Sequence, residues 1–190
     1  MPGFYNKAER FVIKSFYESK NERSVRHFKR TVFWVKKLRP DADDALLVAA
    51  IAHDVERAFR GRDVHEKIRK SREGLTGKDH LRYHEEKSAD IICNFLSGQG
   101  AGAALVERVR MLVSRHEEGG NDDQNLLMDA DSISFFENNV SHFLKTKTVE
   151  FGKKKIRKKF DWMYERIKSE KARVVSKSWY EKAIATLEKI

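Results

Sequence analysis

Cysteine, proline and long apolar runs are scarce in this chain of 190 residues. The single cysteine, Cys93, excludes an internal disulfide framework. Proline occurs only at positions 2 and 40, while strong helix formers fill most of the remainder, which predicts long helices with short connections. The longest apolar run, Ala45 to Ala52, is far shorter than the roughly 20 residues that cross a bilayer. Because the first residues also lack the order of a signal peptide, we expect a cytoplasmic protein without a membrane segment.

The fold class that follows is an all-α, single-domain helical bundle over residues 1–190. A chain of this length buries a substantial core without covalent links. Helices are expected near residues 6–19, 24–38, 42–59, 79–97, 102–116, 131–145, 149–170 and 174–189. Eight of the ten glycines lie between Gly61 and Gly120, where they are typical of interhelical loops.

Positive charge is concentrated at the C-terminal end. The formal net charge is +10, and residues 145–190 hold 15 Lys and Arg against six Asp and Glu. This distribution disfavours nucleic-acid binding over the whole protein surface, but the C-terminal region could bind an acidic partner or attract an anionic substrate. Apolar residues recur at helical spacing in the basic stretch and are expected to pack inward: Ile156, Phe160, Met163 or Tyr164, and Ile167. Its lysines are then expected to lie in water: Lys154, Lys155, Lys158 and Lys159.

The most unusual feature is the dipeptide His53-Asp54 inside an apolar helical stretch. An ionised carboxylate removed from water is very costly unless it is paired or binds a metal. Adjacent helical residues point about 100° apart, so the dipeptide can offer an imidazole and a carboxylate to one ion or to two neighbouring ions. Taken alone, the pair also fits a core histidine beside a surface aspartate.

Four further residues, each near a different expected helix, extend the pattern: His27, His84, His116 and Asp131. The order H…HD…H…H…D resembles the HD superfamily of metal-dependent phosphohydrolases over roughly residues 24–140, with the basic helices of about residues 145–190 packed on this core. Local stretches are similar to the segments that carry that family's ligands: LLVAAIAHDVERA, YHEEKSADII, LVSRHEEGG and LLMDADSISFFE.

The resemblance implies a fold of the HD-domain type with a centre for one or two divalent metal ions. Two sets of ligands follow from it: His27, His53, Asp54 and Asp131 for a first ion, and Asp54, His84 and His116 for a second. Imidazole and carboxylate suit several ions, among them Fe, Mn, Mg, Zn, Co and Ni. The lack of cysteine ligands disfavours a structural zinc site. If His84 and His116 were only exposed polar residues, the first site would remain intact.

Arginines near these residues are candidates for phosphate binding. The family often follows HD with a hydrophobic residue, a glycine and a lysine, and here Arg57 occupies the place of the lysine. A guanidinium can hold a phosphate through two hydrogen bonds. Glu56 occupies the place of the glycine and is expected to be solvated. Arg30, one helical turn after His27, is a second candidate, while three further cations fit ordinary surface charge equally well: Arg60, Arg62 and Lys78.

The leading hypothesis is an HD-type phosphohydrolase that cleaves a phosphoester or phosphoanhydride of a small, nucleotide-like molecule with a metal-activated water. Its catalytic candidates are Asp54, which would bridge the ions, and Arg57 and Arg30, which would stabilise negative charge. One alternative is an HD-type di-iron oxygenase. Iron in the purified protein and consumption of dioxygen with substrate would distinguish it. The other is a nucleic-acid-binding module. Tight, salt-dependent binding of nucleic acid that Asp54→Ala leaves unchanged would distinguish it.

Overall fold

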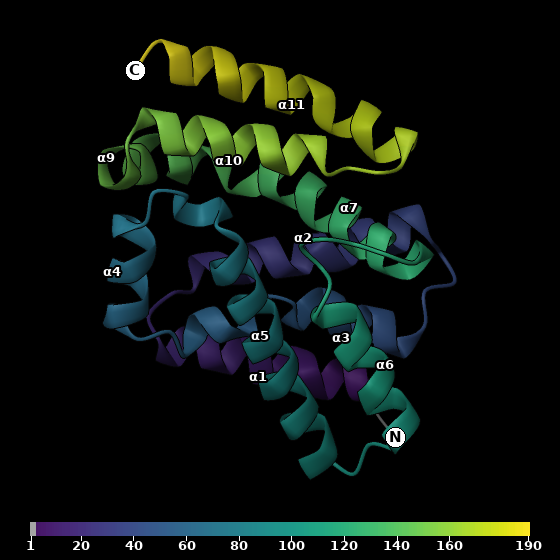
Figure 1. Cartoon of the computed structure of the whole chain (residues 1–190). Coiled ribbons are helices and arrows are strands. Elements are labelled where there is room, and N and C mark those ends of the chain that lie inside the picture. The colour runs from purple at the N-terminus through teal and green to yellow at the C-terminus, as the bar shows by residue number, and fades with distance from the viewer. Residues whose placement is uncertain (1–2) are drawn as a thin grey trace.

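Helices account for most of residues 3–190, the part of the chain that the computed structural model describes, and no strand occurs among these residues (Figure 1). The long helices are α1 (Phe4–Glu18), α2 (Arg23–Leu38), α3 (Asp44–Ala52), α4 (Arg62–Lys70), α5 (Lys78–Gly98), α6 (Ala103–Val113), α7 (Asp122–Asn138), α10 (Lys153–Glu165) and α11 (Glu170–Glu188). Short helical segments complete the path: η1 (Val55–Ala58), η2 (Gly74–Thr76), α8 (Val140–His142), η3 (Phe143–Lys147) and α9 (Thr148–Phe151). The chain forms one compact all-α domain, which confirms the predicted fold class. Within residues 3–190, no helix combines the length and the apolar character that crossing a membrane requires.

α3 lies at the centre of the N-terminal half and packs against α1, α2, α6 and α7. Its sequence, DALLVAAIA, is apolar on every side after the first residue, and seven of its residues are buried. The helix begins at a cap in which the side chain of Asp43 accepts a hydrogen bond from the backbone nitrogen of Leu46 at 2.9 Å. Because α3 runs through the core, the residues that follow its last turn also lie in the interior.

α3 ends at Ala52, earlier than the predicted end near residue 59. His53 and Asp54 form a turn, and the chain continues as the 3-10 helix η1. The last carbonyl groups of a helix lack helical partners, and the carbonyl oxygen of Ala50 lies 3.0 Å from Nδ1 of His53. The dipeptide therefore lies at a buried helix end rather than inside a continuous helix.

Two segments in the middle of the chain depart from the predicted boundaries. α4 is a helix where the surrounding glycines indicated a loop. α7 begins at Asp122 rather than at residue 131, because Asn121 and Gln124 form a capping box in which each side chain satisfies a backbone nitrogen of the other. Asp131 therefore lies in the middle of a long buried helix.

α10 and α11 pack against each other and against α7, and they form the upper layer in Figure 1. The apolar residues predicted to pack inward are buried: Ile156, Phe160, Met163 and Ile167. Lys154 and Lys158 are exposed, as predicted. The prediction is wrong for Lys159, which is only 6% exposed, because it lies on the face of α10 that turns toward the interior together with Phe160.

Candidate metal centre

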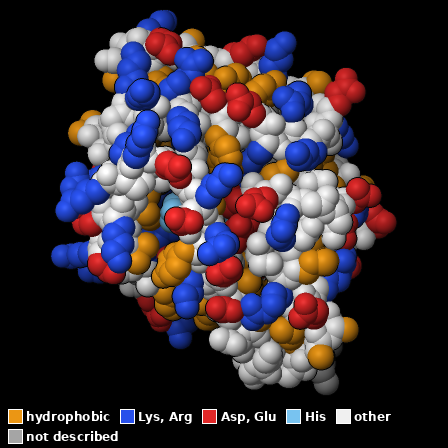
Figure 2. All heavy atoms as spheres, viewed as in Figure 1, with side chains coloured by type: hydrophobic (Ala, Val, Ile, Leu, Met, Phe, Trp, Pro, Cys, Tyr) orange, Lys and Arg blue, Asp and Glu red, His pale blue; other side chains and the backbone are white. Residues whose placement is uncertain are grey.

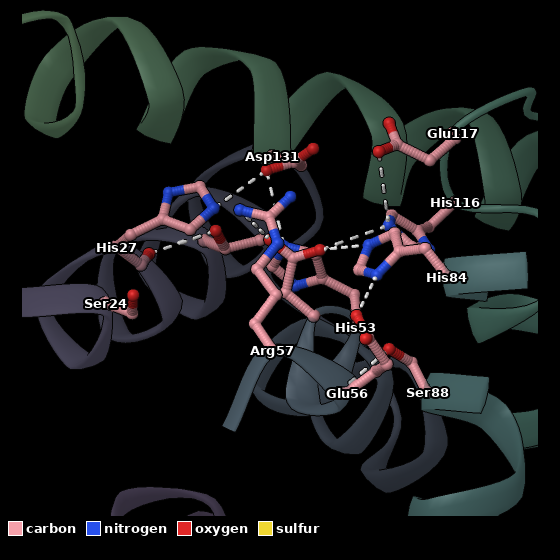
Figure 3. Close-up of polar contacts among 12 residues, drawn as sticks. Ser24, His27, His53, Glu56, Arg57, His84, Ser88, His116, Glu117 and Asp131 are labelled. Carbon is pink, nitrogen blue, oxygen red and sulfur yellow. Dashed lines mark hydrogen bonds and ion pairs between the residues drawn. The ribbon is translucent and has the colours of Figure 1, made fainter. Parts of the chain in front are cut away.

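The six predicted metal ligands come together as two triads of buried side chains (Figure 3). The first triad is His27 on α2, His53 after α3 and Asp131 on α7, and the second is Asp54 after α3, His84 on α5 and His116 after α6. Within each triad, one potential ligand atom of every residue lies within 4.8 Å of the others. Side chains from five separate parts of the chain thus converge in the core.

In the first triad, the carboxylate of Asp131 lies close to both imidazole rings. Its Oδ1 lies 3.0 Å from Nε2 of His27 and 3.4 Å from Nε2 of His53. Ser134, one turn later on α7, orients the His27 ring. Its hydroxyl donates to the carbonyl oxygen of His27 at 2.8 Å, so it accepts from Nδ1 of the same residue at 2.9 Å. In the neutral ring, Nε2 of His27 and Oδ1 of Asp131 then face each other as two acceptors, which a cation between them would satisfy.

Asp54 lies between the two triads. Its Oδ1 pairs with Nε2 of His84 and lies 3.7 Å from Nε2 of His116. Its Oδ2 lies 3.7 Å from Nε2 of His53, a member of the first triad. One carboxylate oxygen therefore faces each triad, so Asp54 could supply a ligand atom to an ion at either one.

The four histidines of the triads share one orientation. In each, Nδ1 faces a hydrogen-bond acceptor outside the triad: Ser134 Oγ for His27, the Ala50 carbonyl at 3.0 Å for His53, Glu56 Oε2 at 3.0 Å for His84, and the Val113 carbonyl at 2.8 Å for His116. Carbonyl and carboxylate oxygens only accept, so the proton of the neutral ring is on Nδ1 and the lone pair is on Nε2. Metal-binding histidines are typically held in this way through their other ring nitrogen.

Several atoms that face one another in the triads make no hydrogen bond. They are His53 Nε2, Asp54 Oδ1, His84 Nε2 and His116 Nε2, and all four are fully buried. Buried polar atoms are rarely left in this state without a ligand or an ordered water. Because imidazole nitrogen and carboxylate oxygen are good ligands for first-row divalent ions, the two triads fit a metal ion each.

The charges within the centre shift the pKa values of its members. Burial by itself lowers the pKa of His116, but the nearby carboxylates of Asp54 and Glu117 outweigh it and raise the pKa to about 9. Burial by itself raises the pKa of Asp54, but the charge of Arg57 outweighs it and holds the pKa well below the usual range. Arg166 has the same effect on the pKa of Asp131. Without a cation, a proton on His116 therefore compensates part of the negative charge that a metal ion would neutralise.

The two arginines predicted to bind phosphate lie in different surroundings. Arg57 on η1 is 2.8 Å from Oδ2 of Asp54 and lines the pocket beside the triads. Arg30 does not line this pocket. Its guanidinium binds both carboxylate oxygens of Glu137 on α7, at 2.7 and 2.8 Å, and stacks on the ring of Phe33 at 3.8 Å. The structure therefore does not bring Arg30 to the centre, because α7 offers it a carboxylate elsewhere.

The prediction of a solvated Glu56 is wrong. Glu56 is 3% exposed, accepts a hydrogen bond from Nδ1 of His84 and pairs with Arg60 on two nitrogens. Burial alone would raise its pKa, but His84 and Arg60 outweigh burial and lower the pKa to about 2. Glu56 thus holds the ring of His84, a candidate ligand, in place.

Arg166, which directly follows α10, is a member of the site that the sequence did not indicate. It is 8% exposed, and its guanidinium pairs with Oδ2 of Asp131 and with Oε2 of Glu117. Its Nε donates to Oγ of Ser132 at 2.9 Å. Arg166 therefore holds one oxygen of Asp131 while the other faces the histidines.

A pocket of about 620 Å³ opens beside the triads, and Asp54, His27 and Asp131 form part of its lining. Six cationic side chains also line it: Arg23, Arg57, Arg60, Arg62, Lys147 and Lys159. Figure 2 shows a hollow left of the centre in which a histidine is visible, with lysine and arginine side chains around it. Lys78, a further candidate for phosphate binding, is not part of the lining. The size suits a small molecule, and the cations suit an anionic one.

Comparison with known proteins gives a family without a described activity. No curated protein and no solved structure matches the chain. The match to a protein family covers residues 13–184, a span that includes both triads, Glu56 and Arg166. By this match the chain belongs to the family described as Domain of unknown function (DUF4202).

Proposed function

We propose that this protein is a metal-dependent phosphohydrolase that cleaves a phosphoester or phosphoanhydride bond in a small phosphorylated molecule such as a nucleotide. One observation carries the proposal: two triads of buried potential ligands, four of whose atoms make no hydrogen bond, lie beside a pocket lined with cations. The order of the ligands along the chain, which resembles the HD superfamily, supports the same reaction class.

Divalent cations in such a centre lower the pKa of a water molecule and neutralise phosphoryl oxygens. Arg57 is placed to assist, because its side chain is one-third exposed and lines the pocket while its guanidinium pairs with Asp54. In this position it can stabilise the negative charge that develops on phosphoryl oxygens during displacement. It also holds Asp54 in the orientation that serves both triads.

Glu117 is the acidic residue best placed to orient the attacking water. It lines the pocket, its Oε2 pairs with Arg166, and its Oε1 lies 3.9 Å from Nε2 of His116. Burial alone would raise the pKa of Glu117, but Arg166 outweighs burial and lowers it. Glu117 is therefore suited to accept a hydrogen bond from the water rather than to keep its proton. Asp131 is less suited, because Arg166 and the histidines already engage both of its oxygens.

The test combines metal analysis with a panel of phosphomonoesters, phosphodiesters and nucleotides. We expect the purified protein to hold up to two divalent ions per chain, and we expect chelation to abolish hydrolysis. Asp54→Asn should lose both the ions and the activity, while Asp90→Asn, a change at a surface ion pair with Arg110, should lose neither. Hydrolysis that survives chelation or Asp54→Asn would contradict the proposal.

Two other outcomes would assign a different function. Bound iron together with consumption of dioxygen, in the absence of hydrolysis, would identify an oxygenase, since the same ligands suit that chemistry. Tight, salt-dependent nucleic-acid binding that is unchanged in Asp54→Asn would identify a binding module instead.

A further inference from the structure

Lys159 differs from the other lysines of α10 in where its side chain lies. Lys153, Lys154 and Lys158 are exposed and Lys155 is half-buried, whereas Lys159 is 6% exposed and lines the pocket beside the triads. Lysine is almost never buried to this extent without a partner, because removing its charge from water is costly. Its position therefore requires an explanation.

Within residues 3–190, the ammonium group of Lys159 makes no hydrogen bond and no ion pair. Its contacts are with aromatic faces: Nζ lies 4.2 Å from the centre of the Trp162 ring and 6.0 Å from that of Phe135. Cation–π contact compensates part of the desolvation and holds the ammonium in place. It leaves the N–H groups free to donate to a molecule in the pocket.

The carboxylates that line the pocket already have cationic partners. Asp54 pairs with Arg57, Glu66 with Arg69, and both Asp131 and Glu117 with Arg166. Arg166 is fully engaged in this way, since its third nitrogen donates to Ser132. One arginine thus serves two carboxylates, and the charge of Lys159 compensates part of theirs from a distance. None of these carboxylates contacts the ammonium directly, so its N–H groups remain available to an anion that enters the pocket.

We propose that Lys159 forms an anion-binding subsite beside the metal centre that holds a phosphoryl group of the substrate. The identity of the anion as a phosphoryl group rests on the proposed function, whereas the presence of an anion subsite rests on the burial of Lys159, its place in the pocket lining and the lack of a direct hydrogen-bond or ion-pair partner at its ammonium within residues 3–190. The subsite comes from the C-terminal helices, outside the segment in which the ligand order resembles the HD superfamily. Lys159 would thus act directly on the substrate, while Arg166 acts through Asp131 and Glu117.

The test measures the binding of inorganic phosphate by calorimetry, both to the protein as purified and after removal of metal by chelation. Lys159→Met should weaken binding about tenfold to a hundredfold, the effect of losing a charged hydrogen bond. Lys159→Gln should give a similar loss, and Lys159→Arg should retain most of the affinity. Lys158→Met removes the neighbouring exposed lysine and should leave binding within about twofold of the original.

Folding and alternative ligands are controlled in the same experiment. Met and Gln have nearly the length of Lys, so thermal unfolding should show that the variants stay folded. Equal binding of phosphate by the original protein and Lys159→Met, or no binding by either, would overturn the subsite. Malonate is an anion without a phosphoryl group. If it bound more tightly than phosphate, with the same dependence on Lys159, the phosphoryl assignment would be overturned.

The binding measurement also separates this inference from the proposed function, because it needs no turnover. Phosphate binding that depends on Lys159, in a protein that hydrolyses no phosphorylated compound, would retain the subsite and refute the hydrolase. If the protein hydrolyses a phosphorylated compound but Lys159→Met leaves phosphate binding unchanged, the hydrolase would be retained and the subsite refuted.

Discussion

Arg166 and Asp131 form a buried ion pair, although 35 positions separate them in the chain. The pair engages Oδ2 of Asp131, while Oδ1 of the same carboxylate faces His27 and His53. The segment after α10 therefore determines how a ligand on α7 is presented to the first triad. This links the basic C-terminal helices to the metal centre.

Replacing Arg166 should weaken metal binding at the first triad. Arg166→Met leaves the carboxylates of Asp131 and Glu117 buried without their cation, a change that typically costs about 3–5 kcal/mol of stability. The freed Asp131 can rotate, so we also expect roughly 10-fold to 100-fold lower metal affinity, the usual effect of losing a group that orients a ligand. Metal titration and thermal unfolding would measure both effects.

The control for this prediction is Arg157→Met. Arg157 lies on α10 and pairs with Asp161 and Glu188 at the surface. Its replacement should leave metal affinity unchanged and stability within about 1 kcal/mol. Unchanged metal affinity in Arg166→Met would show that Asp131 keeps its orientation without the ion pair.

The two triads should lose their ions separately. His84→Ala removes a ligand of the second triad only, and His27→Ala removes a ligand of the first triad only. Each variant should therefore hold about one ion per chain fewer than the original protein, whereas Asp54→Asn should affect both sites. Elemental analysis of the three purified variants would test this. Complete loss of metal in both histidine variants would indicate one cooperative site in place of two separable ones.

The members of the two triads could be predicted from the sequence, because His53-Asp54 and the order of the other histidines follow a recognisable pattern. The all-α fold could be predicted from the scarcity of proline and the abundance of helix formers. The start of α7 was also within reach, since Asn121 and Gln124 form the pattern of a capping box.

The remaining parts of the site depend on tertiary packing. Lys159 and Arg166 reach the centre only because α10 packs beside α7, and no local pattern distinguishes them from the other cations of the basic C-terminal region. The prediction for Arg30 illustrates the same limit. Its position one turn after His27 suggested the pocket, but Glu137 from a distant helix engages its guanidinium.

The stability of the metal-free protein should decrease as pH rises, because of His116. Its pKa is about 9 in the folded protein and about 6.5 in an unfolded chain. The proton bound by the folded state therefore contributes stability that is fully present below about pH 6.5 and is lost as pH rises through about 9. Thermal unfolding of the chelated protein across this range would measure the effect.

His116→Gln is the matched variant for the pH prediction, since it removes the titrating ring and keeps a polar side chain. The difference in stability between the original protein and this variant should be largest below about pH 6.5 and should shrink toward pH 9. Saturation with a divalent ion should remove the pH dependence, because the ion binds the neutral ring in place of the proton. A constant difference across the range would show that His116 binds no extra proton when folded.

Arg57 and Arg30 should differ sharply in their contribution to hydrolysis, although both are arginines close to ligand histidines in the sequence. Arg57→Ala removes a guanidinium that lines the pocket beside Asp54, so kcat should fall about 100-fold to 1,000-fold, as when one transition-state donor is removed. Arg30→Ala removes a partly exposed ion pair with Glu137, so it should lower stability by about 1 kcal/mol or less and leave kcat within about twofold. Steady-state kinetics on the substrate found in the panel would compare the two variants. A large loss of kcat in Arg30→Ala, with melting unchanged, would mean that Arg30 leaves Glu137 and enters the pocket when substrate binds.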